Sequence, residues 1–517
     1  MEVSPCSAHL HLQGSSLMLV LMVASAAIGG TLQYGYNLAI MNAPTTFIQT
    51  FINETFLERW DIQLEDYQVT LVWTIIVSIF SLGGLAGALI AGPMTIRFGR
   101  KKCLLLSNIF LMSGALLAVT SRAAKSFEMI IISRILVGIN AGISMNVQPM
   151  YFGESAPKHL RGAISLSSAV FAAFGVVLGQ VVGLREILGS EPYWQYLLAS
   201  NAIPGFIQLL TLPWFPESPR YLLIDRGDKE ACINALRRLR GCEVQSSELD
   251  EILQEQADTK GMRASRPWEL FTDRSVRWQL ITVMIISSAM QLCGNDSIYF
   301  YASYVFKEAG IADDKIQYVS IGTGTCEFTA CIMNSFSVRK GINVAAHLIH
   351  TFASLHTCKQ HYISWMPYLS MACIFTYILS FGMGPAGVTG VLPTEIFNQT
   401  ARPAAYMIAG SMMWLNLFIT GMIFPFLVVS PSILNTALCR LEPSACCLRC
   451  MLACFCQRPK GSLCQSSQAN STSSTSRASR GRVHQRLKLS ISWVKCVFPQ
   501  HCRPPETVTS SEGLTLT

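Results

Sequence analysis

The chain has 517 residues, of which 51% are hydrophobic and only 14% charged, and its mean hydropathy is +0.38. This composition excludes an ordinary soluble protein, in which about 25% of residues are charged, and indicates a polytopic membrane protein. The net charge of +8 is explained by basic loops and a basic tail, so it indicates membrane topology and no nucleic-acid site.

Apolar segments of about 18 to 28 residues recur along the chain, and at 1.5 Å per residue each is long enough to cross a hydrocarbon core of about 30 Å. The predicted spans are 16–43, 68–94, 103–120, 128–152, 163–185, 193–215, 278–306, 317–337, 367–393 and 404–430. The sequence therefore predicts an all-α membrane protein with ten clear spans.

The charges of the loops predict the orientation. The loop "RFGRKK" and the next even loop, "APKHLRG", are basic and the segment 216–276 is densely charged, whereas the first loop, "NETFLERWDIQLEDYQ", is net acidic. The positive-inside rule then places the N-terminal residues 1–15 and the even loops in the cytosol. No cleavable signal peptide is expected, and Asn53, in the sequon Asn53-Glu54-Thr55, is a candidate glycosylation site on the outside.

A short motif occurs twice. "GESAPKHLRGA" follows the fourth span and "TEIFNQTARPAA" follows the tenth, so that Glu154–Arg161 and Glu395–Arg402 have the same spacing. Two repeated halves are therefore expected. Transporters built from such repeats bind substrate near the midplane between the halves and alternate access around it.

The predicted organisation follows from these observations. It consists of a cytosolic N-terminus (1–15), an N-terminal six-helix half (16–215), a cytosolic linker with short helices (216–276), a C-terminal helical half (277–430, incomplete around 338–362) and a Cys- and Ser-rich tail (431–517). The tail is rich in Ser, Thr and Arg from about residue 461, and we expect it to be disordered.

The span 278–306 contains the polar stretch "MQLCGNDSIYFYAS". On an ideal helix Gln291, Asn295 and Tyr299 share one face, and Asp296 lies about 100° away. Interhelical hydrogen bonds would explain one such residue. These polar residues, however, cover a wide arc of the helix surface, which favours a surface that faces a ligand. Gly294 permits a break in the helix there. Amides, carboxylates and an aromatic ring together suit a sugar, which is neutral and carries many hydroxyls.

Several motifs together resemble those of the sugar porters of the major facilitator superfamily, and among these the animal facilitative glucose/fructose transporters of solute carrier family 2. The motifs are "RFGRKK", "PMYFGESAPKHLRGA", "PESPRYLL", "QLCGNDSIYFYAS" and "TEIFNQTARPAA". The resemblance covers about 16–335 and 361–428. It implies a major facilitator fold of two six-helix halves and a plasma-membrane uniporter that carries glucose, fructose or both by alternating access, with no cofactor and no enzymatic activity.

The resemblance also implies the sugar-binding residues, which are Gln180, Gln291, Asp296, Tyr301, Glu327 and Trp414. Alternatives remain open for three of them: a helix-interface amide for Gln180, a buried ion pair for Glu327, and a lipid-facing or core position for Trp414. Asp296 and Glu327 stand where many relatives carry Asn, and the family's cavity Trp in span ten has no counterpart in "GPAGVTGVLPTE". An intramembrane carboxylate leaves proton coupling open. Asn37, however, stands where proton-coupled porters carry Asp, which favours uniport.

Charges at the cytosolic helix ends are candidates for an inner gate. They are Arg100, Lys101, Glu154, Arg161, Glu395 and Arg402. Ion pairs among them would close the cytosolic side and break when the carrier opens inward. Plain positive-inside topology would explain the basic residues but not Glu154 and Glu395.

The resemblance ends in two places. After Val338 the second "E-R-x-G-R-R" motif and a clean ninth span are missing, and after Val429 the twelfth span and the tail motif are missing. The ninth and twelfth spans are therefore predicted to be degraded or replaced. This leaves open a second hypothesis, a non-transporting isoform that binds sugar or pairs with an intact relative.

The expected partners are a small-molecule sugar and the lipid bilayer, and a homo- or hetero-oligomer is left open. Nine of the 18 cysteines follow Val429, and none has convincing zinc spacing. No metal site is expected.

Overall fold

The structure is a computed structural model that describes residues 5–157, 160–241, 246–259, 266–274, 276–308, 310–333, 366–383 and 400–429, with a few positions between 389 and 397. All regular secondary structure in these ranges is helical. The chain divides into two compact units, Met1–Ala445 and Cys446–Thr517, and every described residue belongs to the first. The predicted irregularities at 338–362 and after Val429, and the candidate gate residue Glu395, lie outside the described residues.

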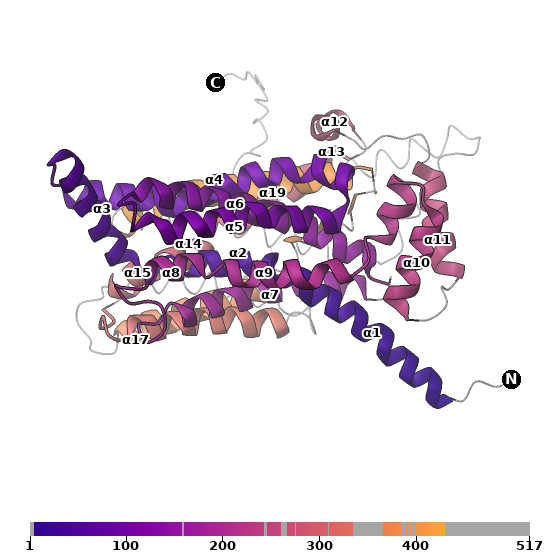
Figure 1. Cartoon of the computed structure of the whole chain (residues 1–517), viewed down its shortest axis with the longest axis horizontal. Coiled ribbons are helices and arrows are strands. Elements are labelled where there is room, and N and C mark those ends of the chain that lie inside the picture. The colour runs from indigo at the N-terminus through magenta and orange to yellow at the C-terminus, as the bar shows by residue number, and fades with distance from the viewer. Residues whose placement is uncertain are drawn as a thin grey trace, which may run out of the picture. The chain divides into compact units, whose positions relative to one another are not determined.

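The helices of the N-terminal half follow one another with short connections (Figure 1). They are α1 (Pro5–Ile28), α2 (Thr31–Ala39), α3 (Thr45–Trp60), α4 (Asp66–Phe98), α5 (Arg100–Ser121), α6 (Phe127–Ser155), α7 (Arg161–Val182), α8 (Trp194–Ala199) and α9 (Ala202–Thr211). The first loop, expected between spans one and two, contains the helix α3.

The linker and the C-terminal half are also helical. Their elements are a π-helical turn (Tyr221–Asp225), α10 (Lys229–Arg240), α11 (Ser246–Thr259), α12 (Pro267–Thr272), α13 (Arg277–Leu292), α14 (Asn295–Phe300), α15 (Ala302–Glu308), a helix at 316–333, α17 (Met366–Gly382) and α19 (Arg402–Val429). Figure 1 shows α10 and α11 together at one end of the helical bundle and α3 at the other end.

Six helices in the described ranges are long and apolar enough to cross a membrane. They are Leu17–Ala39, Asp66–Phe98, Arg100–Ser121, Phe127–Ser155, Arg161–Val182 and Arg402–Pro425. Other predicted spans are interrupted: 193–215 is divided between α8 and α9, and 278–306 between α13, α14 and α15. Gly294 causes the second interruption, since its φ of 83° lies in the left-handed region that favours glycine. The break expected at Gly294 is thus confirmed.

Glycines allow α4 and α6 to pack at very short distance. A Cβ added at Gly83 would come within 2.2 Å of the Ile135 carbonyl oxygen, and one at Gly142 within 2.1 Å of the Gly84 carbonyl oxygen. No side chain fits at such separations, so the backbones meet directly, as small residues permit in membrane helices. This contact fixes α6, which carries Glu154 at its end.

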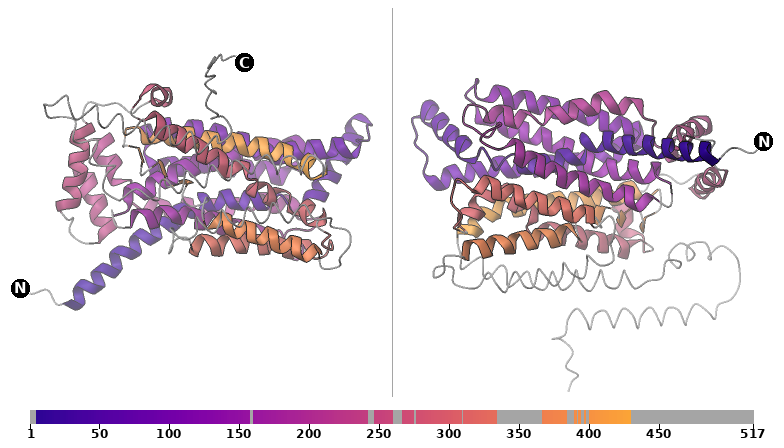
Figure 2. Two further views of the ribbon diagram at one scale, coloured as in Figure 1. Left: turned by 180° about the vertical axis from the view of Figure 1, so that it is seen from behind. Right: turned by 90° about the horizontal axis from the view of Figure 1, so that it is seen from below.

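The two halves meet where α19 packs along α4 and contacts α6, and where α14 approaches α2. Helix 316–333 and α17 lie side by side in the C-terminal half (Figure 2), and the Cys331 thiol is 3.8 Å from the Gly382 carbonyl oxygen. The linker has a small core of its own, in which Leu223, Leu236 and Ile252 are buried. This core attaches α10 and α11 to the π-helical turn and so positions the charges described below.

Candidate functional site

A buried polar cluster lies where α2 of the N-terminal half meets α14 of the C-terminal half. Because the chain turns at Gly294, α14 starts with Asn295 and Asp296, whose exposed fractions are only 1% and 7%. The Tyr34 hydroxyl donates a hydrogen bond of 2.6 Å to Oδ2 of Asp296. This bond joins the two halves at the polar stretch that the sequence singled out, and a second one runs from the Ser303 amide to Oδ1 of Asn42 at 2.9 Å.

Glu327 adds a second carboxylate to this cluster. It projects from helix 316–333, is buried, and accepts a hydrogen bond from the Tyr299 hydroxyl. The Asn295 side chain lies beside both carboxyl groups. In the described part of the chain, all the hydrogen bonds to Asp296 and Glu327 come from neutral side chains. The alternative of a buried ion pair for Glu327 thus finds no basic partner among the described residues.

Several buried amide groups around the cluster lack hydrogen-bond partners among the described residues. They are Nε2 of Gln291, Oδ1 of Asn295 and Oε1 of Gln180. The other end of Gln180 donates to Oγ1 of Thr323 at 3.2 Å, so this side chain also bridges the two halves. Leaving a buried amide unpaired costs about 1–3 kcal/mol. These atoms are therefore available to a polar ligand.

The two aromatic candidates have different surroundings. Trp414 is fully buried and meets the Tyr34 ring edge-on at 5.5 Å, which rules out the lipid-facing alternative and places it next to the cluster. Tyr301 donates to the Gly421 carbonyl oxygen at 2.9 Å and stacks on Phe424. The structure thus engages Tyr301 with α19 and not with Asp296.

Asn37 occupies the position at which the sequence indicated uniport. Its amide donates to the Gln33 carbonyl oxygen at 2.9 Å and its Oδ1 accepts from Asn201 at 3.1 Å, while Arg134 donates to the Asn37 carbonyl oxygen at 3.2 Å. These contacts involve no carboxylate. Arg134 also lies over the Phe80 ring at 4.5 Å, so its charge is met by an aromatic face and a carbonyl.

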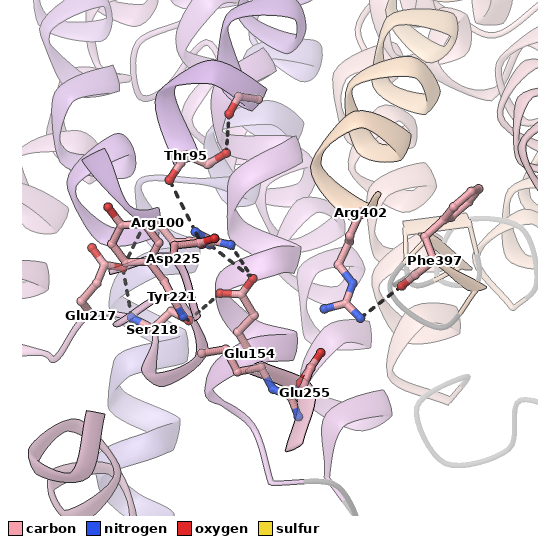
Figure 3. A network of polar contacts seen from close by, with 12 residues as sticks. Thr95, Arg100, Glu154, Glu217, Ser218, Tyr221, Asp225, Glu255, Phe397 and Arg402 are labelled. Atoms are coloured by element: carbon pink, nitrogen blue, oxygen red, sulfur yellow. Dashed lines mark hydrogen bonds and ion pairs between the residues drawn. The ribbon is translucent and has the colours of Figure 1, made fainter. Parts of the chain in front are cut away.

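A network of charges lies at the ends of α4, α5 and α6 (Figure 3). The Arg100 guanidinium is 2.9 Å from Glu154 and 2.8 Å from Asp225, and it lies over the Tyr221 ring at 4.8 Å. The Ser218 hydroxyl donates to Glu154. Since the side chains of Arg100 and Glu154 are only 2% and 1% exposed, this ion pair is shielded from water and salt.

Asp225 lies outside the membrane-spanning helices, in the π-helical turn of the linker. Burial raises its pKa, although the nearby Arg100 guanidinium acts in the opposite direction. Asp225 therefore takes up a proton at higher pH than an exposed aspartate would, and its attraction to Arg100 weakens as it does so.

Basic residues from three further elements surround the network. Arg402, at the start of α19, is close enough to Glu154 and Glu255 to interact electrostatically with both (Figure 3). Arg220 pairs with Glu251 and Glu255 of α11, and Arg161 at the start of α7 lies near the same two carboxylates. The linker helix α11 thus brings negative charge to helix ends of both halves.

Lys101 is placed differently from the other candidate gate residues. Its ammonium group donates to the Phe215 carbonyl oxygen at 2.9 Å and to the Pro213 carbonyl oxygen at 3.3 Å. Lys101 therefore connects α5 to the chain just after α9, within the N-terminal half. Asn53 lies on α3, where its Oδ1 accepts a hydrogen bond from the Leu64 amide at 3.2 Å.

Three residues that were not predicted as site residues complete the polar cluster and the charge network, although Tyr299 was expected on the polar face of its helix. Tyr34 and Tyr299 donate to the two carboxylates, while Glu217 accepts from the backbone amides of Arg100 and Lys101 at the start of α5. Glu217 belongs to "PESPRYLLID", a polar motif directly after a predicted span, and this motif could have indicated Glu217 from the sequence. A carboxylate there satisfies amides that have no partner within the helix.

The fold defines the class of protein. A solved structure of the proton:xylose symporter XylE, bound to 6-bromo-6-deoxy-D-glucose, is similar with a TM-score of 0.72 and 22% identity, over 85% of this chain and 96% of that one. An inward open structure of XylE from E. coli is similar with a TM-score of 0.63 and 21% identity, over 86% and 98%. The described helices thus have the fold of a major facilitator superfamily transporter.

Sequence comparison gives the family. The model of the family "Sugar (and other) transporter" matches residues 22–439. Solute carrier family 2, facilitated glucose transporter member 11, of Homo sapiens is 54% identical over 80% of this chain and 84% of that protein. Member 5 of Mus musculus is 43% identical over 80% and 84%. The chain belongs to the sugar transporter family, which confirms the resemblance.

Proposed function

We propose that this protein carries a hexose, glucose or fructose, down its gradient across the plasma membrane by alternating access, as a uniporter whose N-terminus is cytosolic. The observation that carries the proposal is the buried polar cluster between the halves, where amide atoms of Gln180, Gln291 and Asn295 have no partner among the described residues. These groups match the hydroxyls of a sugar. The names of two relatives, both facilitated glucose transporters, support the choice of substrate.

In this proposal the sugar contacts side chains from both halves. The binding residues are Gln180, Gln291, Asp296, Tyr301, Glu327 and Trp414. Asn37 leaves the usual proton site neutral, which supports uniport, and Asn53 is the proposed glycosylation site.

Uptake of radiolabelled glucose and fructose into proteoliposomes that contain only this chain tests the function. We expect saturable uptake that persists when a protonophore is added and no other energy source is present. Collapse of uptake with the protonophore would overturn uniport. Binding of sugar without uptake would instead favour a non-transporting isoform, the hypothesis raised by the altered sequence after Val338 and Val429.

The charge network is the proposed inner gate, formed by Arg100, Lys101, Glu154, Arg161, Arg402 and, from the sequence motif, Glu395. Within it, Arg402 of the C-terminal half interacts with Glu154 of the N-terminal half. Separation of the halves on this side removes that attraction, whereas the Arg100–Glu154 pair moves as one unit with the N-terminal half. The Glu154–Arg402 interaction therefore contributes to the closed-inside state alone.

Arg402→Ala is expected to shift the carrier toward the inward-open state without abolishing sugar binding, because only the closed-inside state loses an attraction. The measurement is the rate at which a membrane-impermeant thiol reagent, applied from the cytosolic side, labels a cysteine introduced next to the polar cluster. Arg238→Ala is the control, since the Arg238 guanidinium donates to the Trp214 carbonyl oxygen and Arg238 is not one of the proposed gate residues. Equal labelling rates in wild type and Arg402→Ala would contradict the gate.

A further inference from the structure

A row of exposed apolar side chains on α9 ends in an exposed tryptophan. Ile203, Phe206, Ile207 and Leu210 recur at helical spacing and are 63%, 56%, 40% and 57% exposed. Trp214 continues the row in the turn Leu212–Trp214 directly after the helix, and it is 75% exposed. Tryptophan at the end of a membrane span lies at the level of the lipid headgroups. The row therefore has the form of a surface that faces a phospholipid along its length.

Two positive charges meet the backbone of this turn. The Lys101 ammonium group donates to the carbonyl oxygens of Pro213 and Phe215 at 3.3 Å and 2.9 Å. The Arg238 guanidinium, which comes from α10, donates to the Trp214 carbonyl oxygen at 2.6 Å. Three successive carbonyl oxygens thus hold two cations from different helices directly beside the exposed tryptophan.

Lys102 brings a third positive charge to the same turn. Its side chain is exposed at the start of α5, and it makes no hydrogen bond or ion pair in the described part of the chain. Both Lys102 and Arg238 are close enough to repel the Lys101 ammonium group. One carboxylate, Glu217, attracts Lys101 there, and its Oε1 already accepts from three backbone amides. The surface around Trp214 therefore keeps an excess of positive charge.

We propose that Lys101, Lys102, Trp214 and Arg238 form a site for the headgroup of an anionic phospholipid, whose acyl chains lie along the apolar row of α9. An ammonium has three N–H donors and a guanidinium five, so Lys102 and Arg238 have donors left for a phosphate and a carboxylate. Plain positive-inside topology explains basic residues near a span end, but not their convergence on one turn beside an exposed tryptophan. In the proposed orientation the site faces the cytosolic leaflet, which carries the anionic lipids.

Binding of lipid to the purified full chain tests the site. The protein is kept in an uncharged detergent, and the probes are radiolabelled phosphatidylserine and phosphatidylcholine with the same acyl chains. We expect phosphatidylserine to bind at a concentration about 30-fold lower, the ratio given by about 1 kcal/mol for each of Lys102 and Arg238. Equal binding of the two lipids would overturn the proposal.

Charge-neutralising variants locate the site on the molecule. Lys102→Gln and Arg238→Gln are each expected to weaken the binding of phosphatidylserine about 5-fold, and the double variant about 30-fold. Lys229→Gln is the matched control, because Lys229 is an exposed basic residue at the other end of α10, and it should bind like the wild type. Equal weakening in Lys229→Gln and Lys102→Gln would show attraction by net charge alone and overturn the site.

A soluble headgroup separates a lipid site from a phosphate site. Glycerophosphoserine, which lacks acyl chains, is expected to displace phosphatidylserine only at a concentration at least about 100-fold higher, because contact of a few methylene groups with α9 adds this much affinity. Displacement at equal concentration would overturn the lipid as the ligand. None of these measurements involves sugar uptake, so they decide the lipid site whether or not the chain transports a hexose.

Discussion

Arg100→Ala is expected to destabilise the protein more than any other single change in the charge network. It leaves Glu154 buried without its principal cation, and Asp225 loses the same partner. Removing one member of a buried ion pair costs about 3–5 kcal/mol because the other charge remains out of water. Ser218 continues to donate to Glu154 but supplies no charge. Thermal unfolding of the purified protein in detergent measures the loss.

A surface ion pair provides the control for this experiment. Arg59 and Glu128 are 2.7 Å apart, as close as the buried pair, but their side chains are 34% and 42% exposed. Arg59→Ala should cost no more than about 1 kcal/mol, since exposed pairs are weakened by water and salt. Equal destabilisation by Arg59→Ala and Arg100→Ala would show that burial of the network contributes nothing.

Gln291→Ala and Asp296→Ala are expected to weaken sugar transport while the protein remains folded and inserted. The loss of a hydrogen bond to a buried polar ligand group costs about 1–3 kcal/mol, which corresponds to roughly 5- to 150-fold in affinity. The measurement is the concentration of sugar that gives half-maximal uptake. Asp296→Asn, which restores the residue of many relatives, should retain transport with an altered preference among sugars.

The same variants separate sugar binding from helix packing. If Gln291 and Asp296 served only to hold helices together, their replacement would lower thermal stability and leave the affinity of the surviving protein near that of the wild type. Ser297→Ala is a suitable control, because Ser297 lies on α14 and is buried, and no role in binding is proposed for it. Wild-type affinity and selectivity in Gln291→Ala, Asp296→Ala and Asp296→Asn would exclude a role of these residues in sugar binding.

Local features of the site could be predicted because they depend on neighbours in the sequence. Gly294 marked the break between α13 and α14, and the repeated spacing from Glu154 to Arg161 marked a helix end. Tyr34 could not be assigned to Asp296, since 262 residues separate them and only the packing of the two halves brings them together.

Hydropathy also could not decide whether Trp414 faces lipid or the protein interior, because both environments are apolar. Trp414 suits lipid and protein interior alike, so its complete burial against Tyr34 and Phe80 depends on the position of α19. Asp225 was overlooked for a related reason: in a densely charged linker, no pattern distinguishes a carboxylate that meets Arg100 from one that meets water.

The hydrogen bond from Tyr34 to Asp296 has a consequence for the return of the empty carrier. In the proposed cycle a uniporter must reorient without cargo after each delivery, and a bare carboxylate between its halves would oppose that step. The Tyr34 hydroxyl occupies the acceptor that a sugar hydroxyl would otherwise use, and so acts as a built-in surrogate for the substrate. In this cycle an arriving sugar has to displace the Tyr34 hydroxyl from Asp296, which lowers the affinity of the protein for the sugar. The benefit is that the empty carrier can reorient while the Asp296 carboxylate keeps a hydrogen-bond donor.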